Sequence, residues 1–300
     1  MGHLLKRRKR IFMAAGIVLA AVIVIAVFIK VEIYISYNSL ETKEYTVTSD
    51  RIESEVKIAL ISDLHDHTFG EKNKELVQML KDQKPDLILM AGDMINDVSK
   101  DSHVAVELIE QVKDIAPVYY SLGNQEEDYI GRGTSDLLNE LKDAGAIVLD
   151  ESYQDIQVNG NAIRLGGMYD YAFALDGNNT TTKESMRPSL YHFLTDFQET
   201  DSCRLMMAHR PDSFIFGDAA KTWEIDLVVS GHNHGGQVIL PVLGGIYGGD
   251  QGWFPKYVDG IHHFKTVKNM VITRGLGSGE EKLPRFNNKP EVVIIHLEKE

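Results

Sequence analysis

Five short apolar segments of this chain each run directly into residues of the types that bind metals. The five junctions are Ser62-Asp63-Leu64-His65, Ala91-Gly92-Asp93, Leu122-Gly123-Asn124, Ala208-His209 and Ser230-Gly231-His232-Asn233-His234. Apolar runs of this length, bounded by glycine or polar residues, predict buried strands. In α/β sheets, ligands bind where the carboxyl ends of the strands meet. The sequence therefore predicts that all five junctions converge on one rim of the fold.

The order of the predicted elements favours an α/β domain. Apolar segments at 57–62, 86–91 and 117–122 predict strands, and amphipathic segments at 73–82 and 103–113 predict the helices between them. This alternation is typical of parallel strands with crossover helices. The second half contains further predicted strands with fewer helices between them, at 162–167, 204–208, 227–230, 237–240, 270–274 and 291–297. We expect one α/β domain that contains two sheets.

No single junction is specific to a functional site. Asp-x-His, Gly-Asp and Gly-Asn also occur in loops and turns, and His209 alone is compatible with a buried structural histidine. The pair His232 and His234 is more informative, because alternate residues of an extended segment point to the same side and both rings can reach one centre. Five such junctions in order along one chain together favour a metal site.

The combined set contains two carboxylates, one amide and four imidazoles. Its members are Asp63, Asp93, Asn124, His65, His209, His232 and His234. Imidazole with oxygen ligands suits Mn, Fe, Zn or Ni. Seven side chains exceed what one ion takes from a protein, so they suit two divalent metal ions that share a bridging ligand. Two ions about 3.5–4 Å apart hold a hydroxide and clamp phosphoryl oxygens, which indicates phosphoester hydrolysis.

These motifs resemble the pattern of the calcineurin-like metallophosphoesterase superfamily, which is D-x-H, G-D, G-N-H-[DE], a single H and then G-H-x-H. In this chain the pattern stands as Asp63-Leu64-His65, Gly92-Asp93, Gly123-Asn124-Gln125-Glu126, His209 and Gly231-His232-Asn233-His234. The resemblance covers roughly residues 55–298. Further stretches are similar to a bacterial, often membrane-anchored branch of phosphohydrolases: His209-Arg210-Pro211, Gly235-Gly236-Gln237 and Gln251-Gly252-Trp253-Phe254-Pro255-Lys256-Tyr257.

The resemblance implies a four-layer α/β/β/α sandwich with two mixed sheets. It also implies hydrolysis by attack of a metal-bound hydroxide on phosphorus. The ligands would divide between two ions. One ion would be held by Asp63, His65 and His234, the other by Asn124, His209 and His232, with Asp93 as the bridge.

Asn124 and Gln125 are the candidate catalytic residues, and Gln125 departs from the family pattern. The family has a histidine there that assists the leaving group, and an amide cannot transfer a proton at neutral pH. We therefore expect metal binding to persist and the turnover of poor leaving groups to be slowed, unless another acid substitutes. His67 and the pair His262-His263 are candidates for this acid, and solvated histidines are the alternative interpretation.

Two further features are candidates for substrate contacts. Arg285 is a candidate for phosphate binding, because a guanidinium group matches phosphate oxygens, and a surface arginine is the alternative. Trp253, Phe254 and Tyr257 lie in a glycine-rich loop after the last metal ligands. They are candidates to shape the pocket or to touch lipid, and packing of the loop onto the domain is the alternative.

Residues 11–29 form an uncharged apolar run that, as a helix, spans roughly 28 Å, close to the hydrocarbon thickness of a bilayer. Five basic residues precede it, so the positive-inside rule predicts a cytoplasmic N-terminus and an extracytoplasmic domain. A cleaved signal peptide is the alternative, although the run is long and no small-x-small site follows. We expect a single-pass anchor in the cell membrane within residues 1–35, a polar tether at 36–54 and the metallophosphoesterase domain at 55–300.

Charge limits the partners of the domain. The first thirty residues contain six of the 31 basic residues and none of the 44 acidic ones, so the rest of the chain is strongly acidic. Such a surface repels nucleic acid, and no nucleic-acid binding is expected. Cys203 is the only cysteine, which excludes an intramolecular disulfide. Its apolar surroundings predict a buried side chain rather than a catalytic thiol.

Together these features predict a membrane-anchored, outward-facing, dimetal-dependent hydrolase of phosphoesters, and of phosphodiesters in particular. Location alone suggests lipid-linked or cell-envelope phosphoesters as substrates. Because Gln125 replaces the usual histidine, the alternative is a metal-binding ectodomain with impaired catalysis that acts as a binding or sensing module. A scaffold without metal is a third interpretation.

Overall fold

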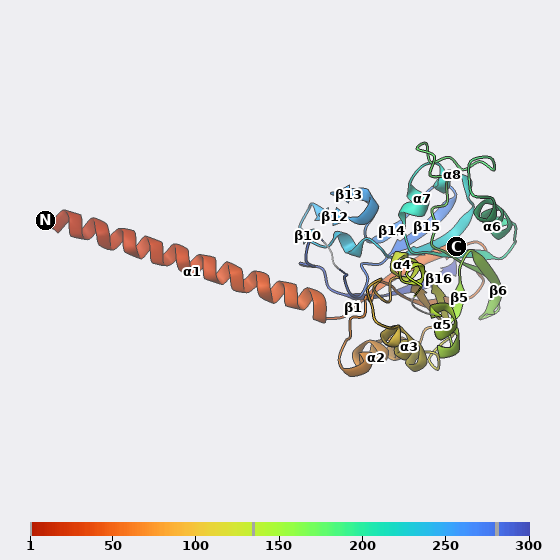
Figure 1. The fold of residues 1–300 in the computed structure, drawn as a ribbon, viewed down its shortest axis with the longest axis horizontal. Helices are drawn as coiled ribbons and strands as arrows, with labels where there is room; N and C mark the ends of the chain where they lie inside the picture. Colours follow the sequence, from red (N-terminus) through yellow and green to blue (C-terminus); the bar gives the residue numbers. More distant parts are fainter. Residues whose placement is uncertain (1, 134–135, 280–281) are drawn as a thin grey trace.

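The computed structural model of the chain describes residues 2–133, 136–279 and 282–300. A long helix, α1 (Gly2–Asn38), projects from an α/β domain (Figure 1). The segment Lys6–Asn38 is long and apolar enough to cross a membrane, although a signal sequence would pass the same test. Its most apolar window is not buried against the domain. The predicted N-terminal apolar helix is therefore present.

Two six-stranded mixed sheets form the centre of the domain. The first has the order β1 (Glu41–Ser49), β16 (Glu291–Lys299), β2 (Val56–Ile61), β3 (Leu87–Ala91), β4 (Val118–Ser121) and β5 (Ile147–Leu149). The second has the order β14 (Gly260–His262), β15 (Val267–Ile272), β9 (Ile225–Ser230), β8 (Cys203–Ala208), β7 (Asn161–Met168) and β6 (Ser152–Val158). Strands β2 to β5 are parallel to one another, and so are β7, β8, β9 and β15. The metal-ligand residues follow strands of these two parallel groups.

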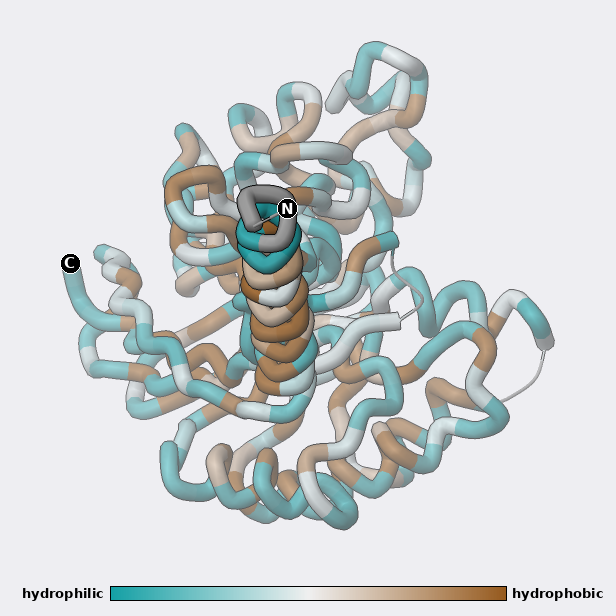
Figure 2. Tube along the Cα trace, turned by 90° about the vertical axis from the view of Figure 1, so that its left-hand side faces the viewer, coloured by the Kyte–Doolittle hydropathy of each residue, from teal (hydrophilic) through white to brown (hydrophobic). Residues whose placement is uncertain are grey.

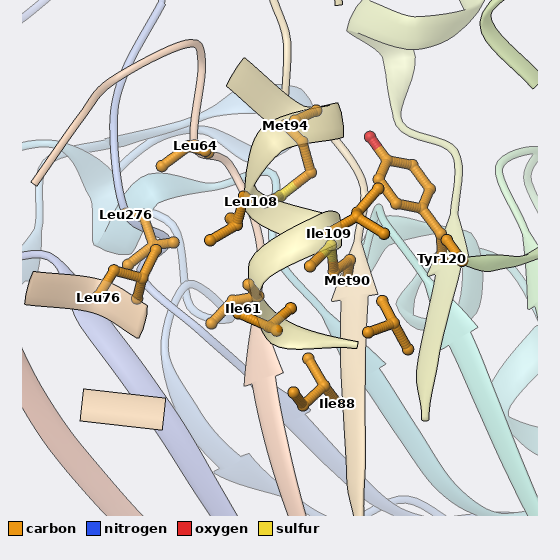
Figure 3. Packing of buried hydrophobic residues seen from close by; sticks show 14 of the residues in the cluster. Ile61, Leu64, Leu76, Ile88, Met90, Met94, Leu108, Ile109, Tyr120 and Leu276 are labelled. Carbon is orange, nitrogen blue, oxygen red and sulfur yellow. The ribbon is translucent and has the colours of Figure 1, made fainter. Parts of the chain in front are cut away.

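Helices cover the outer face of each sheet. The first sheet is covered by α2 (Lys74–Gln83), α3 (His103–Val112) and α5 (Leu137–Ala144), and the second by α6 (Pro188–Gln198), α7 (Asp212–Ile215) and α8 (Ala219–Thr222). Figure 3 shows the first of these interfaces, where Ile61 and Ile88 of the sheet meet Leu108 and Ile109 of α3. A further hydrophobic core lies between the two sheets. The predicted four-layer α/β/β/α sandwich is confirmed.

Strand β2 explains why the central strands are continuously apolar. Its alternate residues point to opposite faces of the sheet. Ala59 and Ile61 pack in the core under the helices, whereas Ile58 and Leu60 pack in the core between the sheets. A strand buried on both faces has no solvent-facing positions, so it lacks the polar alternation of an edge strand. The pairing of β2 with its neighbouring strands fixes where the strand ends and so places Asp63 at the rim of the sheet.

The structure corrects the expectation that residues 36–54 form a tether. Helix α1 continues to Asn38, and Glu41–Ser49 form β1, which pairs in parallel with the whole of β16. Strand β1 is an edge strand whose buried side chains include Val47 and Ser49, while its other residues are more exposed. An edge strand with one solvated face has a polar composition, which is why the sequence resembles a linker there.

Residues 237–257, which we call the lobe, consist of two short hairpins. Strand β10 (Ile239–Leu240) pairs with β11 (Gly244–Gly245), and β12 (Tyr247–Gly248) pairs with β13 (Gly252–Trp253). The predicted strand at 237–240 is therefore confirmed only for its last two residues. The lobe lies on the side of the domain from which α1 projects (Figure 1). Figure 2 faces this side and shows hydrophobic stretches of chain beside the helix.

Candidate metal centre

The ends of five buried strands bring the seven predicted ligands together. Strands β2, β3 and β4 of the first sheet and β8 and β9 of the second lead into the turns that carry them. Donor atoms of Asp63, His65 and His234 lie within 4.8 Å of one another, and so do those of Asp93, His209 and His232. Asn124, the first residue of helix α4 (Asn124–Gly131), lines the same pocket. The convergence predicted from the sequence is therefore present in the structure.

Most of the seven residues adopt strained backbone conformations. Five have positive φ angles: Asp63 (55°), His65 (51°), Asp93 (53°), His232 (68°) and His234 (44°). For a non-glycine residue this region costs about 1 kcal/mol or more. Such strain concentrates at functional sites, where the surrounding structure enforces it. The tight turns after the strands thus have a locally unfavourable backbone conformation that directs these side chains toward a common centre.

Asp93 lies between the two groups of donor atoms. Its Oδ2 atom is 3.1 Å from Nε2 of His209 and 3.9 Å from Nε2 of His65. Its Oδ1 atom accepts a hydrogen bond from the main-chain N–H of Gln125 at 2.9 Å, so the carboxylate is fixed in orientation. A single oxygen that faces both groups is what a bridging ligand requires.

Hydrogen bonds to Nδ1 set the tautomers of three histidines. Nδ1 of His65 lies 2.9 Å from Oδ1 of Asn96, and Nδ1 of His209 lies 2.7 Å from the carbonyl oxygen of Ala91. Nδ1 of His234 lies 3.2 Å from the carbonyl oxygen of Gly277. All three partners accept hydrogen bonds, so Nδ1 carries the proton and Nε2 carries the lone pair. This is the arrangement of metal-binding histidines whose rings are oriented from behind.

Several buried polar atoms of the site lack hydrogen-bond partners among the residues that the structure describes. They are Nε2 of His65, His209 and His232 and Oδ1 of Asn124. Buried polar groups in proteins are almost always satisfied, and each exception calls for a ligand or another explanation. Three imidazole lone pairs and one amide oxygen that face a common pocket fit divalent cations well. The donor set therefore agrees with the divalent metal ions that the sequence predicts.

The electrostatics of the site also favour a cation. Burial alone would raise the pKa of Asp93, but the imidazoles of His209 and His65 hold this pKa below its ordinary value. Burial would lower the pKa of His209, but Asp93 and Asp63 raise it to about 9. The two buried carboxylates thus supply negative charge that a cation can offset. Divalent ions would bind Nε2 of His209 in place of the second proton that the raised pKa favours there.

Glu126 fixes the spacing between two of the turns. Its buried carboxylate accepts hydrogen bonds from the main-chain N–H groups of Asp93, Met94 and Gly123, each at 2.8 Å, and from the hydroxyl of Tyr120 at 2.6 Å. It therefore ties the turn after β3 to the turn after β4. The motif assigned Glu126 no role; its position three residues after the glycine that caps α4 is the signal that could have indicated one.

The pocket at the metal centre is small, with a volume of about 60 Å³. Its lining includes His65, Asp93, Asn124, Gln125, His232, His234 and, from the lobe, Gln237, Tyr247 and Gly249. Gln125 is thus at the pocket, as predicted. Its Oε1 atom accepts a hydrogen bond from the main-chain N–H of Asp97 at 2.8 Å.

Arg285 is not at the pocket. It is completely buried, and its guanidinium donates to main-chain carbonyl oxygens that include those of Gly277 and Arg274, each at 2.9 Å. The carbonyl oxygen of Gly277 is also the partner of His234. In this structure Arg285 therefore supports the metal centre from behind instead of facing a phosphate. Sequence alone could not separate these roles, because both use the same donors.

The three candidate replacement acids also lie away from the pocket lining. The ring of His67 packs edge-on against Phe69, and its Nε2 atom is buried. His262 contacts the carbonyl oxygen of Asp259, and His263 that of Lys268. Their positions give none of them contact with the pocket.

Cys203 and Asp250 are two further residues outside the set of predicted ligands. Cys203 is buried in β8, as the sequence predicts, and burial raises the pKa of its thiol to about 12. Asp250 of the lobe was not predicted. Its Oδ2 atom lies 3.6 Å from Nε2 of His232 and accepts a hydrogen bond from the hydroxyl of Tyr171 at 2.7 Å.

Several known proteins are similar to this chain in sequence. It is 28% identical over 276 residues to the metallophosphoesterase YkuE of Bacillus subtilis, a match that covers 88% of this chain and 87% of that protein. It is 28% identical over 245 residues to the phosphodiesterase YaeI of Escherichia coli, covering 80% and 82% respectively. A longer metallophosphoesterase of Caenorhabditis elegans is 27% identical over 220 residues, and the match covers 70% of this chain and 44% of that protein.

A solved dimetal phosphatase from Danio rerio is similar with a TM-score of 0.40 and 10% identity, covering 75% of this chain and 88% of that one. The family model described as calcineurin-like phosphoesterase matches residues 56–236. This match contains all seven predicted ligands, and the family implies divalent metal ions and a metal-dependent phosphoesterase activity. The chain therefore belongs to the calcineurin-like phosphoesterase family.

Proposed function

We propose that this protein is a dimetal phosphoester hydrolase that acts on phosphodiesters and faces the outside of the cell membrane. The observation that carries the proposal is the position of Oδ2 of Asp93 between two groups of buried donor atoms. The name of the relative YaeI, a phosphodiesterase, supports the choice of diesters. The apolar run 11–29 of helix α1, preceded within the same helix by five basic residues, supports the location.

The two ions would be held by separate groups that share one residue. Asp63, His65 and His234 would hold one ion, Asn124, His209 and His232 the other, and Asp93 would contact both. Ions bound in this way activate water and neutralise charge on phosphoryl oxygens. The chain's part is to keep the donor atoms aimed at the pocket, through the hydrogen bonds to Nδ1 of the histidines.

The test is hydrolysis of bis-(p-nitrophenyl) phosphate with Mn²⁺, together with the metal content of the purified protein. We expect activity to vanish in Asp93→Ala and His232→Ala, with less than two ions per chain. Asp155→Ala is a suitable control, because Asp155 lies on β6, its side chain is exposed, and its ion-pair partner is Arg164 of β7. Equal activity and equal metal content in the two site variants would refute the proposal.

Gln125 favours a second candidate function, that of a metal-loaded binding or sensing module with impaired catalysis. The residue lines the pocket at the position where the family pattern has an acid, and none of the three candidate histidines reaches that lining. The discriminating variant is Gln125→His. A large gain in turnover would indicate an enzyme degraded at this position. A robust wild-type rate without gain would indicate that another residue supplies the proton.

A further inference from the structure

The lobe presents large apolar side chains to solvent at both its hairpins. Val242 is fully exposed, and Leu243, Trp253 and Phe254 are 63%, 61% and 64% exposed. Val242 also has a φ of 73°, which is rare for a β-branched residue and indicates a strained turn. Clusters of exposed apolar side chains mark interaction surfaces. Tryptophan and other aromatic residues are typical of membrane interfaces.

Direct contacts place the lobe at the end of the apolar run of α1. The main-chain N–H of Ile239 donates to the carbonyl oxygen of Phe286 at 3.0 Å, and the side chain of Asn287 donates to the carbonyl oxygen of Ile239 at 3.0 Å. The ring of Phe286 lies edge-on to that of Phe28, with centroids 6.4 Å apart. Phe28 is the penultimate residue of the apolar run 11–29. Strand β10 is therefore close to the level at which this run ends.

The last turn of α1 holds the same loop and so orients the domain. Oγ of Ser36, which is completely buried, accepts a hydrogen bond from the main-chain N–H of Asn288 at 3.2 Å. The hydroxyl of Tyr37 accepts one from the main-chain N–H of Arg285 at 3.3 Å. With α1 upright in a membrane, these contacts turn the lobe side of the domain toward the bilayer (Figure 1).

The lobe also forms one wall of the metal pocket. Gln237, Tyr247 and Gly249 line the pocket opposite residues of the strand-end turns. The exposed side chain of Lys256 follows the tip of the second hairpin. A lysine at a membrane surface attracts anionic lipid headgroups. The same segment of chain thus carries the apolar tips, a basic residue and part of the pocket.

We propose that Val242, Leu243, Trp253 and Phe254 insert into the outer surface of the membrane that α1 crosses, and that the substrate is a phosphoester carried by a lipid of that membrane. This inference rests on the proposed function and names the class of substrate for the same pocket. The insertion would hold the pocket at the height of the lipid phosphates. It would also favour a substrate that never leaves the bilayer.

Trp253 provides a direct test, because the chain contains only two tryptophans. The full-length protein is reconstituted in phosphatidylcholine–phosphatidylglycerol vesicles, with and without brominated acyl chains. We expect the bromines to quench Trp253. Trp223 is an internal reference, since it is 2% exposed and its indole N–H donates to the carbonyl oxygen of Ala172. Trp253→Phe should abolish the quenching, and unquenched wild-type emission would refute the insertion.

Kinetics test the substrate class. A double variant, Val242→Ser with Leu243→Ser, is compared with wild type on phosphatidyl-p-nitrophenol in vesicles and on soluble bis-(p-nitrophenyl) phosphate. We expect the rate on the lipid ester to fall about tenfold or more, because membrane association scales with buried apolar area, and the rate on the soluble ester to stay unchanged. Leu175→Ser is the matched control, since Leu175 is 74% exposed on a loop that contacts α8.

The outcomes separate the two proposals. Equal losses on both esters, or no loss on either, would overturn the lipid substrate while leaving the hydrolase in place. A wild-type protein that is inactive on both esters would refute the proposed function, and the quenching of Trp253 would still report whether the lobe meets the membrane.

A second inference concerns Tyr247 and rests on a different observation. Nζ of Lys282 donates a hydrogen bond to the hydroxyl of Tyr247 at 2.5 Å and lies 4.4 Å from the centroid of its ring. An ammonium group can only donate, so the phenol keeps its own proton for another acceptor. Tyr247 lines the pocket together with Asn124 and Gln125.

We infer that Tyr247 protonates the leaving group of the proposed hydrolysis. As the oxygen of water bonds to phosphorus and releases one proton to solvent, the ester P–O bond breaks, and the leaving oxygen takes the electron pair of that bond and the phenol proton. The phenolate that remains lies beside the ammonium group of Lys282, which stabilises it, and water then restores the phenol proton. The residue would thus supply what Gln125 lacks.

The test is the dependence of the rate on the leaving group. In Tyr247→Phe we expect a loss of about 100-fold or more on diphenyl phosphate, within the range for general acids, and a much smaller loss on bis-(p-nitrophenyl) phosphate, whose leaving group needs no proton. Adding Gln125→His should restore the diphenyl phosphate rate. Lys282→Met should show the same selectivity in weaker form. Its control is Lys221→Met, because Lys221 is an exposed lysine on α8 that pairs with Asp218. Equal losses on both esters would refute the role.

Discussion

The two walls of the pocket are built in different ways. The strand-end turns are buried, follow strands that pack on both faces, and hold five of the proposed metal ligands at positive φ angles. The lobe consists of hairpins with two paired residues in each strand, has glycine at several turns, and exposes its apolar tips. Buried hydrogen bonds such as those of Glu126 restrain the first wall. The second wall has far less burial to restrain it.

This difference suggests a division of labour. Metal ligands tolerate little displacement, so they belong on the most constrained part of the fold. A wall that meets a substrate or a membrane gains from adaptable loops that a rigid scaffold positions. If the comparison is right, substitutions in the turns should disturb metal binding and stability strongly. Substitutions of equal size in the lobe should leave both nearly unchanged.

Glu126→Ala should have the largest effect. The substitution leaves the main-chain N–H groups of Asp93, Met94 and Gly123 buried without an acceptor, and unsatisfied groups of this kind cost about 1–3 kcal/mol each. We expect a loss of at least about 3 kcal/mol in the free energy of unfolding by urea, together with loss of the second metal ion. Tyr120→Phe removes only one of the hydrogen bonds and should cost about 1 kcal/mol.

Gly123→Ala should come next. A Cβ atom at this position would lie 2.2 Å from Oδ1 of Asp93 and 2.6 Å from its main-chain nitrogen, so the turn after β3 must shift. A displacement of about 1 Å at a catalytic centre costs on the order of 100-fold in rate. We expect that loss in the hydrolysis of bis-(p-nitrophenyl) phosphate, with the fold retained by circular dichroism. Unchanged turnover would show that the turns are more adaptable than their burial implies.

Asn96→Ala should have a smaller effect, because Asn96 contacts a ligand and not a metal. Its Oδ1 atom orients His65, and its Nδ2 atom donates to the carbonyl oxygen of the same residue at 3.0 Å. Loss of such an orienting partner typically costs about 10–100-fold in metal affinity. We expect a loss in this range, measured by competition with a chelator. Asn139→Ala, at an exposed asparagine of α5, is the control. An unchanged affinity would mean that packing alone orients His65.

The same contrast decides how much could be predicted from the sequence. The convergence of the proposed ligands was predictable because each follows a continuously apolar strand, and the burial of β2 on both faces fixes where such a strand ends. Gln125 was placed at the pocket for the same reason. Strand β1 was not predictable, because an edge strand with a solvated face has the composition of a linker.

Other features depend on contacts between distant parts of the chain. The sequence shows that Arg285 can donate hydrogen bonds, but only the fold shows that it donates them to carbonyl oxygens such as that of Gly277. The lobe carries almost no periodic pattern, so its place beside α1 rests on the contact between Phe28 and Phe286, 258 positions apart in the numbering of the chain. Local sequence patterns predict helices and strands, whereas contacts between distant residues determine what the side chains at their ends bind.

Gly244→Ala should have the smallest effect and is the sharpest probe of the lobe. Gly244 has a φ of 74°, which an alanine adopts at a cost of about 1 kcal/mol or slightly more. A Cβ atom there would meet no other atom within 4 Å, so nothing beyond this local strain opposes the change. We expect a small drop in the midpoint of thermal unfolding, a full complement of metal and an unchanged rate on bis-(p-nitrophenyl) phosphate. A loss of metal comparable to that of Gly123→Ala would show that the lobe and the turns form one cooperative unit, and the division of labour between the two walls would then be wrong.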